Sequence, residues 1–241
     1  MTTIVHNLQL VRDRITTACI AAGRDPASVH LLAVSKTFGA DAVSQAAAEG
    51  QQAFGENYIA EGVEKILALR QCVADAAHPM VVDRHLQWHC IGPIQSNKTR
   101  LVAEHFDWVQ SIDRLKIAER LSQQRPADLP PLQVCLQVNI DGGANKSGVT
   151  PDEALALARQ VAQLPSLVLR GLMSIPEPAT DFVASCALHA RAKALFDYIN
   201  ASGELPHPMD TLSIGMSADL EAAVHSGSTM VRVGTAIFGA R

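Results

Sequence analysis

Aromatic residues are scarce in this chain, at 4% of its 241 residues, and charged residues make up only 18%. The core must therefore be built from aliphatic side chains, which the 48% hydrophobic content can supply. A net charge of −4 provides no basic field for nucleic acid. No apolar run approaches the ~18 residues needed to span a bilayer. We expect neither a nucleic-acid partner nor a membrane-spanning segment.

Cysteine pairs at metal-binding or redox spacing are also missing. The five cysteines are scattered without a CxxC motif, and the first residues show no basic stretch followed by an apolar one. An odd number of cysteines without a secretory signal indicates a reducing compartment and argues against disulfides and structural zinc. The nine histidines form no metal-ligand pair at helical spacing. We expect a cytoplasmic protein with no metal site.

Short apolar runs alternate with helical patterns along the whole chain. The pattern predicts strands over residues 31–35, 53–55, 86–91, 108–112, 132–140, 168–175, 211–214 and 230–233. It predicts helices over residues 4–22, 41–49, 57–69, 97–104, 113–123 (capped by Asp113), 181–200 and 217–225, and one that begins at Thr150.

Eight strands alternating with helices, without a hairpin signal, predict an α/β fold with a parallel sheet. Eight such units in this length favour a single (β/α)8 TIM barrel over residues 1–241, preceded by an extra N-terminal helix. No long linker divides the chain. An open doubly wound sheet is the alternative, because hydropathy alone cannot show that a sheet closes.

Lys36 stands directly after the first apolar run, where a turn signal begins. Lysine is rarely buried, so one at the tip of a core strand needs an explanation. Desolvation disfavours the ammonium form and makes the amine nucleophilic, which is the condition for a Schiff base with an aldehyde or ketone. The alternative is a lysine that extends into solvent or pairs with a carboxylate.

The loops after the last two predicted strands have the features of a phosphate site. One contains Ser213 and Ser217, and the other contains Gly234 and Thr235. Glycine permits close backbone approach, N–H groups at a helix start bind phosphate, and these two loops often do so in such barrels. Alternatively, Ser217 is only a helix cap and Gly234 only part of a tight turn.

A lysine amine opposite a phosphate site suggests pyridoxal 5'-phosphate (PLP) as the cofactor. Arg232 lies on the last strand, two residues before Gly234, and could donate a hydrogen bond to the pyridine nitrogen. Because arginine stays protonated, that nitrogen would then carry no proton. The alternative is an arginine inside the barrel that pairs with a buried acid such as Glu221.

Three further residues near predicted strand ends are weaker candidates. Asn57 could bind a cofactor oxygen or cap the helix that follows. His89 could line the cofactor pocket or be a satisfied core histidine. Lys146 could accept the aldehyde in transit, but an exposed loop lysine is the simpler interpretation.

Several stretches resemble the pyridoxal phosphate homeostasis protein family, which in turn resembles the barrel domain of alanine racemase, of PLP fold type III. The resemblance covers nearly the whole chain. It is carried by Leu31-Leu32-Ala33-Val34-Ser35-Lys36, Phe54-Gly55-Glu56-Asn57-Tyr58, Trp88-His89-Cys90-Ile91-Gly92, Gln95-Ser96-Asn97-Lys98, Lys146-Ser147-Gly148, Gly171-Leu172-Met173, residues 213–219 and residues 227–235.

The resemblance implies that Lys36 carries the cofactor and that Arg232 faces the pyridine nitrogen. It also implies that Ser213, Gly234 and Thr235 help to hold the phosphate. The implied role is to keep PLP available and harmless inside the cell, without catalytic turnover. We expect a monomer whose partners are PLP and PLP-dependent apo-enzymes. Cys90 departs from the pattern, since an aromatic residue is expected there.

Two other functions remain open at this point. One is an amino-acid racemase of the same fold type, which would need a second acid/base opposite the lysine. The chain has only Tyr58 and Tyr198 as candidate tyrosines, and Tyr198 lies on a predicted outer helix. The other is a Schiff-base aldolase without a cofactor.

Overall fold

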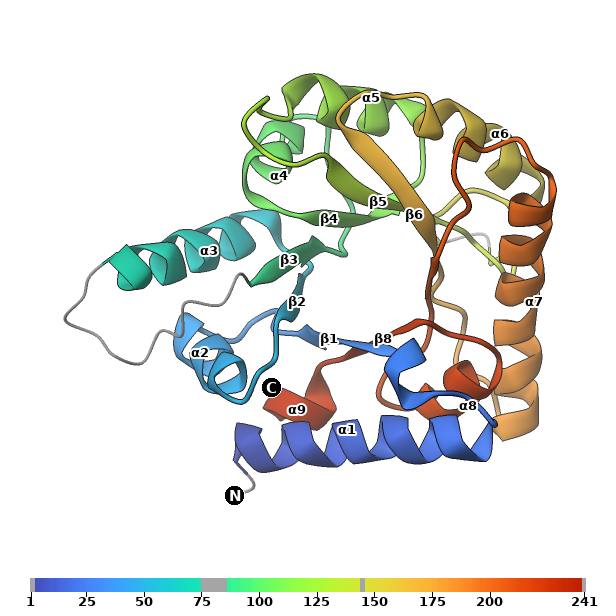
Figure 1. The fold of residues 1–241 in the computed structure, drawn as a ribbon, viewed down its shortest axis with the longest axis horizontal. Helices are drawn as coiled ribbons and strands as arrows, with labels where there is room; N and C mark the ends of the chain where they lie inside the picture. Colours follow the sequence, from blue (N-terminus) through green and yellow to red (C-terminus); the bar gives the residue numbers. More distant parts are fainter. Residues whose placement is uncertain (1–2, 75–85, 144–145, 240–241) are drawn as a thin grey trace.

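Eight parallel strands close into a barrel in the computed structural model, which describes residues 3–74, 86–143 and 146–239 (Figure 1). The barrel closes where β1 pairs with β8, with His30 opposite Met230 and Ala33 opposite Val233. The predicted barrel is therefore confirmed, and the open sheet is excluded. The strands are β1 (His30–Val34), β2 (Ala53–Glu56), β3 (Gln87–Cys90), β4 (Trp108–Ile112), β5 (Leu132–Gln137), β6 (Leu167–Met173), β7 (Thr211–Ser213) and β8 (Met230–Val233).

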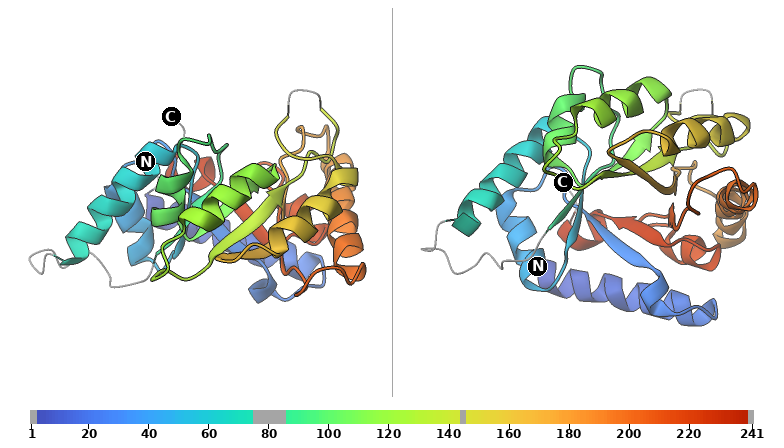
Figure 2. Two further views of the ribbon diagram at one scale, coloured as in Figure 1. Left: turned by 90° about the horizontal axis from the view of Figure 1, so that it is seen from above. Right: turned by 45° about the horizontal axis from the view of Figure 1, so that its top comes forward.

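Helices surround the barrel, and the extra N-terminal helix α1 (Ile4–Ala21) lies beside the junction of β1 and β8 (Figures 1 and 2). It contacts α2, α8 and α9, so it belongs to the helical layer. No helix in the described part of the chain is long and apolar enough to cross a membrane. The others are α2 (Ala40–Ala48), α3 (Ile59–Ala74), α4 (Thr99–His105), α5 (Leu115–Gln124), α6 (Pro151–Ala162), α7 (Phe182–Ala201), α8 (Leu220–His225) and α9 (Thr235–Phe238), with a 3-10 turn at Pro26–Ser28.

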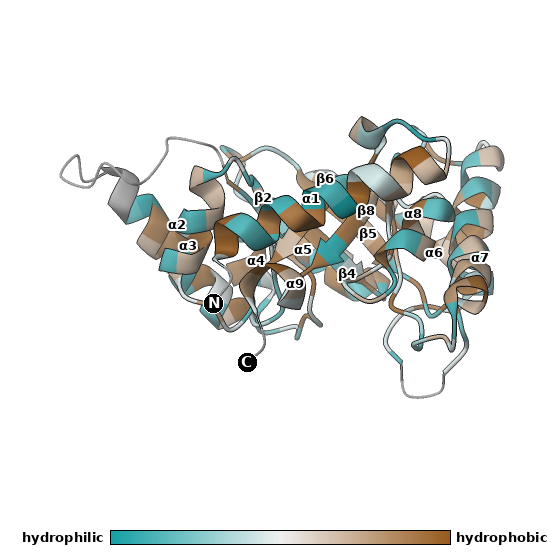
Figure 3. Ribbon diagram, turned by 90° about the horizontal axis from the view of Figure 1, so that it is seen from below, coloured by the Kyte–Doolittle hydropathy of each residue, from teal (hydrophilic) through white to brown (hydrophobic). Residues whose placement is uncertain are grey.

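The hydropathy of each element follows from its place in these two layers. Strands inside a ring of helices are covered on their outer faces, and every residue of β4 and β8 is buried. The helices have one apolar face toward the strands and one polar face toward solvent, seen as alternating brown and teal on α1 and α7 (Figure 3). Because the strands are buried on both faces and the helices on one, the strands are continuous apolar runs in the sequence and the helices are not.

Helix starts were predicted with mixed success. At α6 the capping box between Thr150 and Glu153 is present, with Pro151 at the first position, as predicted. At α5 the predicted cap is wrong, because the helix begins at Leu115 and Asp113 accepts instead from the Arg114 side chain at 3.1 Å.

Several element ends also differ from the prediction. Strand β5 ends at Gln137 instead of residue 140, because the Asn139 amide donates to Val149 and leaves the sheet. Strand β6 ends at Met173 instead of residue 175, α8 begins at Leu220 instead of residue 217, and the short helix α9 was not predicted.

Candidate functional site

The predicted cofactor residues lie at the carboxyl ends of neighbouring strands. Lys36 is two residues beyond β1, Arg232 is in β8, and Gly234 with Thr235 directly follows β8. Because Leu32 of β1 lies opposite Arg232 in the sheet, Lys36 is a few residues beyond the arginine on the neighbouring strand. The barrel thus brings the predicted amine, cation and phosphate loop to one end.

Both residues that flank Lys36 are held by a charged cluster of Glu56, Glu61 and Lys65, in which Glu56 and Lys65 are buried and Glu61 is partly exposed. Lys65 Nζ donates to the Ser35 carbonyl at 2.9 Å, and the Ser35 hydroxyl donates to Glu56 Oε1 at 2.6 Å. The amide of Thr37 donates to Glu61, and Thr37 has a left-handed φ of 70°. A β-branched residue rarely adopts that conformation, so the surrounding bonds must impose it. The half-buried Lys36 therefore sits on a backbone fixed on both sides.

Glu56 and Lys65 form the centre of this cluster. Lys65 Nζ lies 2.6 Å from Glu56 Oε1, and both side chains are almost fully buried. Burial raises the pKa of the Glu56 carboxyl, although the hydrogen bonds from Lys65 and Ser35 oppose that effect. A pair of this kind tolerates the loss of one partner poorly, because the other charge would remain buried.

Arg232 is a buried cation held by neutral acceptors. One of its terminal nitrogens donates to the Ser213 carbonyl at 2.6 Å and to Ser213 Oγ at 2.8 Å, and the other donates to the Ser174 carbonyl at 2.9 Å. Burial lowers the pKa of Arg232 to about 10, which still leaves the guanidinium charged at neutral pH. The alternative pairing with Glu221 is wrong, since Glu221 binds Arg14 at 2.8 Å.

These contacts use three of the five N–H donors of the guanidinium. In the described part of the chain, Nε–H and one terminal N–H have no partner. Arg232 therefore has donors available for a ligand, and its anchors Ser213 and Ser174 lie where β7 and β6 end. This arrangement fits a group with an unprotonated ring nitrogen.

Ser213 has a different place from the one predicted. Its side chain is fully buried at the end of β7, and its hydroxyl donates to Gln110 Oε1 at 2.7 Å while accepting from Arg232. A hydroxyl with its one proton already donated cannot also donate to phosphate. The predicted phosphate contact from this side chain does not fit the geometry, which makes Ser213 a support for Arg232.

Ser217 and Thr235 do come together across the two predicted phosphate loops. Their hydroxyl oxygens are 3.4 Å apart, Ser217 being half-buried and Thr235 exposed. A Cβ added to Gly234 would lie only 3.1 Å from the Val34 carbonyl oxygen, so the loop passes close to the end of β1. Two hydroxyls beside a tightly packed glycine fit a small oxyanion such as a phosphate group.

The loop between β7 and α8 is fixed at three points. The Gly215 carbonyl accepts from the Arg232 amide at 3.0 Å, and the Met216 amide donates to Asp219 Oδ1 at 2.6 Å. The Ser217 carbonyl accepts from Arg14 of α1 at 3.1 Å. The N-terminal helix thus helps to position the predicted phosphate loop.

Asp219 links that loop to helix α7. Its second oxygen, Oδ2, lies 2.9 Å from Nε2 of the buried His189. Burial alone would raise the pKa of Asp219, but the hydrogen bonds from His189 and the Met216 amide outweigh burial and lower it. The carboxylate therefore stays charged while it holds the loop.

The three weaker candidates have different outcomes. Asn57 directly follows β2, half-buried, and its carbonyl would lie 2.2 Å from a Cβ at Gly92, so only glycine permits this loop contact. His89 is fully buried, and burial lowers its pKa to about 3. It is not the satisfied core histidine of the alternative, because its Nε2 has no hydrogen-bond partner in the described part of the chain.

Lys146 is not the exposed loop lysine of the simpler interpretation. Its side chain is 19% exposed, and Nζ binds Asp141 at 2.9 Å, the Ile175 carbonyl at 3.0 Å and Glu177 at 3.2 Å. Burial alone would lower the pKa of Lys146, but the hydrogen bonds that it donates to these carboxylates raise it, so the amine is held as a cation. This contact set describes a structural ion pair between two loops.

Sequence reasoning assigned no role to Gln110, Asp219 or Lys65. Gln110 offered one signal, because it places a polar amide in a run that was predicted to be a core strand. The sequence offered no signal for the ion pair between Lys65 and Glu56, which are nine residues apart. This pair depends on how α3 packs on β2.

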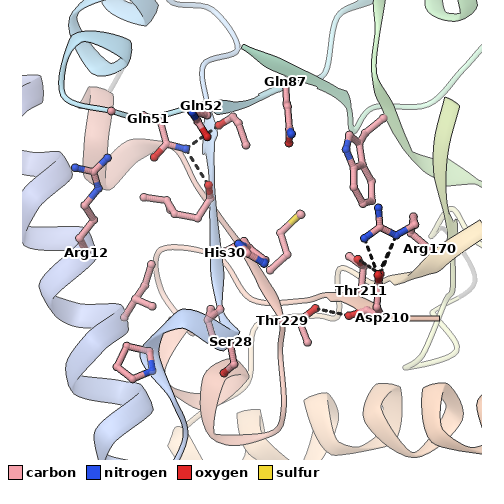
Figure 4. Close-up of a pocket in the computed structure, with 18 of the residues that line it drawn as sticks. Arg12, Ser28, His30, Gln51, Gln52, Gln87, Arg170, Asp210, Thr211 and Thr229 are labelled. Carbon is pink, nitrogen blue, oxygen red and sulfur yellow. Dashed lines mark hydrogen bonds and ion pairs between the residues drawn. The ribbon is translucent and has the colours of Figure 1, made fainter. Parts of the chain in front are cut away.

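A cavity of about 740 Å³ opens at the opposite end of the barrel, where the strands begin (Figure 4). Within it Arg170 binds Asp210 through two nitrogens and lies 4.9 Å above the Trp108 ring. None of the predicted cofactor residues lines this cavity. Its polar lining comes from Arg12, Thr16, Ser28, His30, Gln51, Gln52, Gln87, Arg170, Asp210, Thr211 and Thr229.

Known proteins resemble this chain over its whole length. Residues 2–241 match the family model for the N-terminal domain of alanine racemase. The pyridoxal phosphate homeostasis protein of Pseudomonas aeruginosa is 55% identical over 241 residues, which cover 100% of this chain and 97% of that protein. This chain belongs to the pyridoxal phosphate homeostasis protein family. The predicted resemblance is confirmed.

Two solved structures resemble this chain to different degrees. PipY of Synechococcus elongatus PCC7942, solved with PLP bound, is 35% identical with a TM-score of 0.76, covering 93% of this chain and 100% of PipY. Alanine racemase of Corynebacterium glutamicum is 18% identical with a TM-score of 0.62, and the match covers 97% of this chain but only 62% of the racemase. The second likeness shows the fold alone.

Proposed function

We propose that this protein binds PLP at the carboxyl ends of its strands and keeps the cofactor available in the cytoplasm. The observation that carries this proposal is that Lys36, just beyond β1, and Arg232, on the neighbouring β8, lie toward the same end of the barrel as the Ser217–Thr235 pair. The family relationship and the PLP bound to PipY support the same ligand. When bound, PLP supplies a reactive aldehyde and an electron-withdrawing ring.

Each residue has a distinct task in this proposal. Lys36 would hold the cofactor through its amine, the group that condenses with an aldehyde such as the one PLP would supply. Arg232 donates to the unprotonated ring nitrogen, and Ser217 and Thr235 donate to the phosphate. Asn57, at the neighbouring end of β2, is proposed to contact a cofactor oxygen.

We further propose that the protein is a carrier, without catalytic turnover. A protonated Arg232 leaves the ring nitrogen without a proton, which makes the ring a poor electron sink for a carbanion. A racemase would need a second base, and the two tyrosines are poor candidates: Tyr58 and Tyr198 are both exposed, the latter on helix α7. The family name supports a role in homeostasis.

The proposed partners are PLP-dependent apo-enzymes, and the proposed working form is a monomer. All the residues assigned to the cofactor come from one chain, so the site needs no second copy. To test the carrier role, PLP-loaded protein would be freed of unbound cofactor by gel filtration and mixed with an apo-aminotransferase. We expect reactivation of the apo-enzyme. Loss of all PLP during gel filtration would contradict the proposal.

A further inference from the structure

A row of buried polar side chains crosses the interior of the barrel from Arg232 to the opposite wall. Arg232 of β8 donates to Ser213 Oγ of β7 at 2.8 Å, and that hydroxyl donates to Gln110 Oε1 of β4 at 2.7 Å. Gln110 Nε2 then lies 3.0 Å from His89 Nδ1 of β3. All four residues are between 0% and 4% exposed. Such a row, closed to water, must satisfy its own hydrogen bonds.

The direction of each bond in the row follows from Arg232 and from the orientation of the Gln110 amide. Because a guanidinium can only donate, Ser213 Oγ accepts from Arg232, and it donates its own proton to Gln110 Oε1, the amide atom that faces it. The Gln110 amide nitrogen therefore faces His89 and donates to Nδ1. His89 must then be neutral, with its proton on Nε2.

In the described part of the chain, no hydrogen bond at the other side of the His89 imidazole fixes which nitrogen carries the proton. His89 Nε2 is buried without a hydrogen-bond partner in the described part of the chain. The ring is stacked on Trp108 at 5.0 Å, a contact that does not distinguish the two nitrogens. The tautomer is therefore selected from the Gln110 side alone.

We infer that Gln110 is a positioning residue that directs the Arg232 guanidinium toward the ring nitrogen of the cofactor. This inference rests on the proposed function. Gln110 fixes the Ser213 hydroxyl, and Ser213 supplies two of the three acceptors that hold the guanidinium. A neutral amide does this without placing an anion beside the arginine, so the positive charge remains available to the ligand.

The test compares PLP with an analogue whose ring nitrogen is replaced by carbon. Gln110→Leu removes both the amide oxygen and the amide nitrogen, and we expect it to weaken PLP binding about tenfold, the usual size for one hydrogen bond to a charged group. Binding of the carbon analogue should change far less. Ser213→Ala should have the same selective effect, and the double variant should lose less than the two single losses combined.

Cys135→Ala serves as the matched control, because Cys135 is fully buried inside the barrel in a cluster with Trp108 and Met173. It should leave the preference for PLP over the analogue unchanged. Equal losses for both ligands in Gln110→Leu would overturn the inference and show a merely structural role. If wild-type protein binds neither ligand, the proposed function itself fails, which is a different outcome.

A second measurement needs no cofactor, and its first part needs no variant. Nitrogen-15 NMR of the wild-type histidines should show His89 as the neutral tautomer with its proton on Nε2. Gln110→Glu presents a carboxylate oxygen to Nδ1, so we expect the proton to move to Nδ1. A wild-type His89 protonated at Nδ1 would contradict the inferred bond directions.

Discussion

Lys65 Nζ lies 2.6 Å from Glu56 Oε1, with the two side chains 4% and 0% exposed. This buried ion pair also binds Ser35, the residue before Lys36, through its carbonyl and hydroxyl groups. The residue before Lys36, the proposed cofactor lysine, is thus hydrogen-bonded to a buried ion pair.

Replacing Lys65 should therefore destabilise the fold strongly. We expect Lys65→Met to lower the free energy of unfolding by about 3–5 kcal/mol, because Glu56 would stay buried without its cation. Chemical denaturation would measure this. Lys193→Met is the matched control, since it breaks an exposed pair with Asp197 and should cost under about 1 kcal/mol.

The double variant Lys65→Met/Glu56→Gln separates charge from packing. Removing the orphaned charge should recover part of the stability lost in Lys65→Met. Two results would show that the buried charge does not cause the loss of stability. One is a double variant that is less stable than Lys65→Met, and the other is an equal loss of unfolding free energy in Lys65→Met and Lys193→Met.

The phosphate contacts can be tested through the ligand. Thr235→Val removes a hydroxyl that lies 3.4 Å from Ser217 Oγ. We expect PLP binding to weaken about ten- to hundredfold, while binding of pyridoxal, which has no phosphate, changes little. Thr17→Val on the exposed face of α1 is the control. Equal losses for PLP and pyridoxal would mean that Thr235 does not contact phosphate.

The Asp219 carboxylate should make stability depend on pH. Its pKa is lowered in the folded protein, where hydrogen bonds from His189 and the Met216 amide outweigh burial. Such a group stabilises the fold above its ordinary pKa of about 3.9, and the contribution is lost as pH falls through the folded value.

Asp219→Asn should consequently lose less stability than wild type between about pH 6 and pH 3. Urea denaturation at both pH values would measure the difference, and Asp128→Asn in an exposed loop is the control. An unchanged pH dependence in Asp219→Asn would refute the role of the carboxylate.

The proposed absence of turnover is also testable. PLP-loaded protein would be incubated with single L-amino acids, and the products separated by chiral chromatography. We expect no racemisation near the rates of ordinary enzymes, because loss of one general acid/base typically costs about 10²–10⁴ in rate. Turnover of any amino acid at about 1 s⁻¹ or faster would favour the racemase.

The fold was largely predictable from the sequence because buried parallel strands are continuous apolar runs. All eight strands lie where such runs occur, and residues 108–112 and 230–233 match β4 and β8 at both ends. Element ends were less predictable because they depend on contacts made elsewhere. At the end of β5, for instance, the Asn139 amide donates to the Val149 carbonyl instead of to β6. No residue nearby in the sequence indicates this bond.

The site was predictable only at the level of strand ends. Lys36, Arg232 and Thr235 could be placed at one end of the barrel from strand order alone. The partner of each side chain could not, because Ser213 and Gln110 are 103 residues apart and meet only when the barrel closes. This is why Ser213 was predicted to bind phosphate when its hydroxyl supports Arg232 instead.

The most direct test of the central claim is to locate the lysine that binds PLP. Wild-type protein with PLP should show an absorbance band near ~420 nm, as expected for a lysine Schiff base. After borohydride reduction, peptide mass spectrometry should find the pyridoxyl group on Lys36, and Lys36→Ala should lose both signals. A protein that stays colourless with added PLP, or a pyridoxyl group found only on another lysine such as Lys65 or Lys146, would contradict the account.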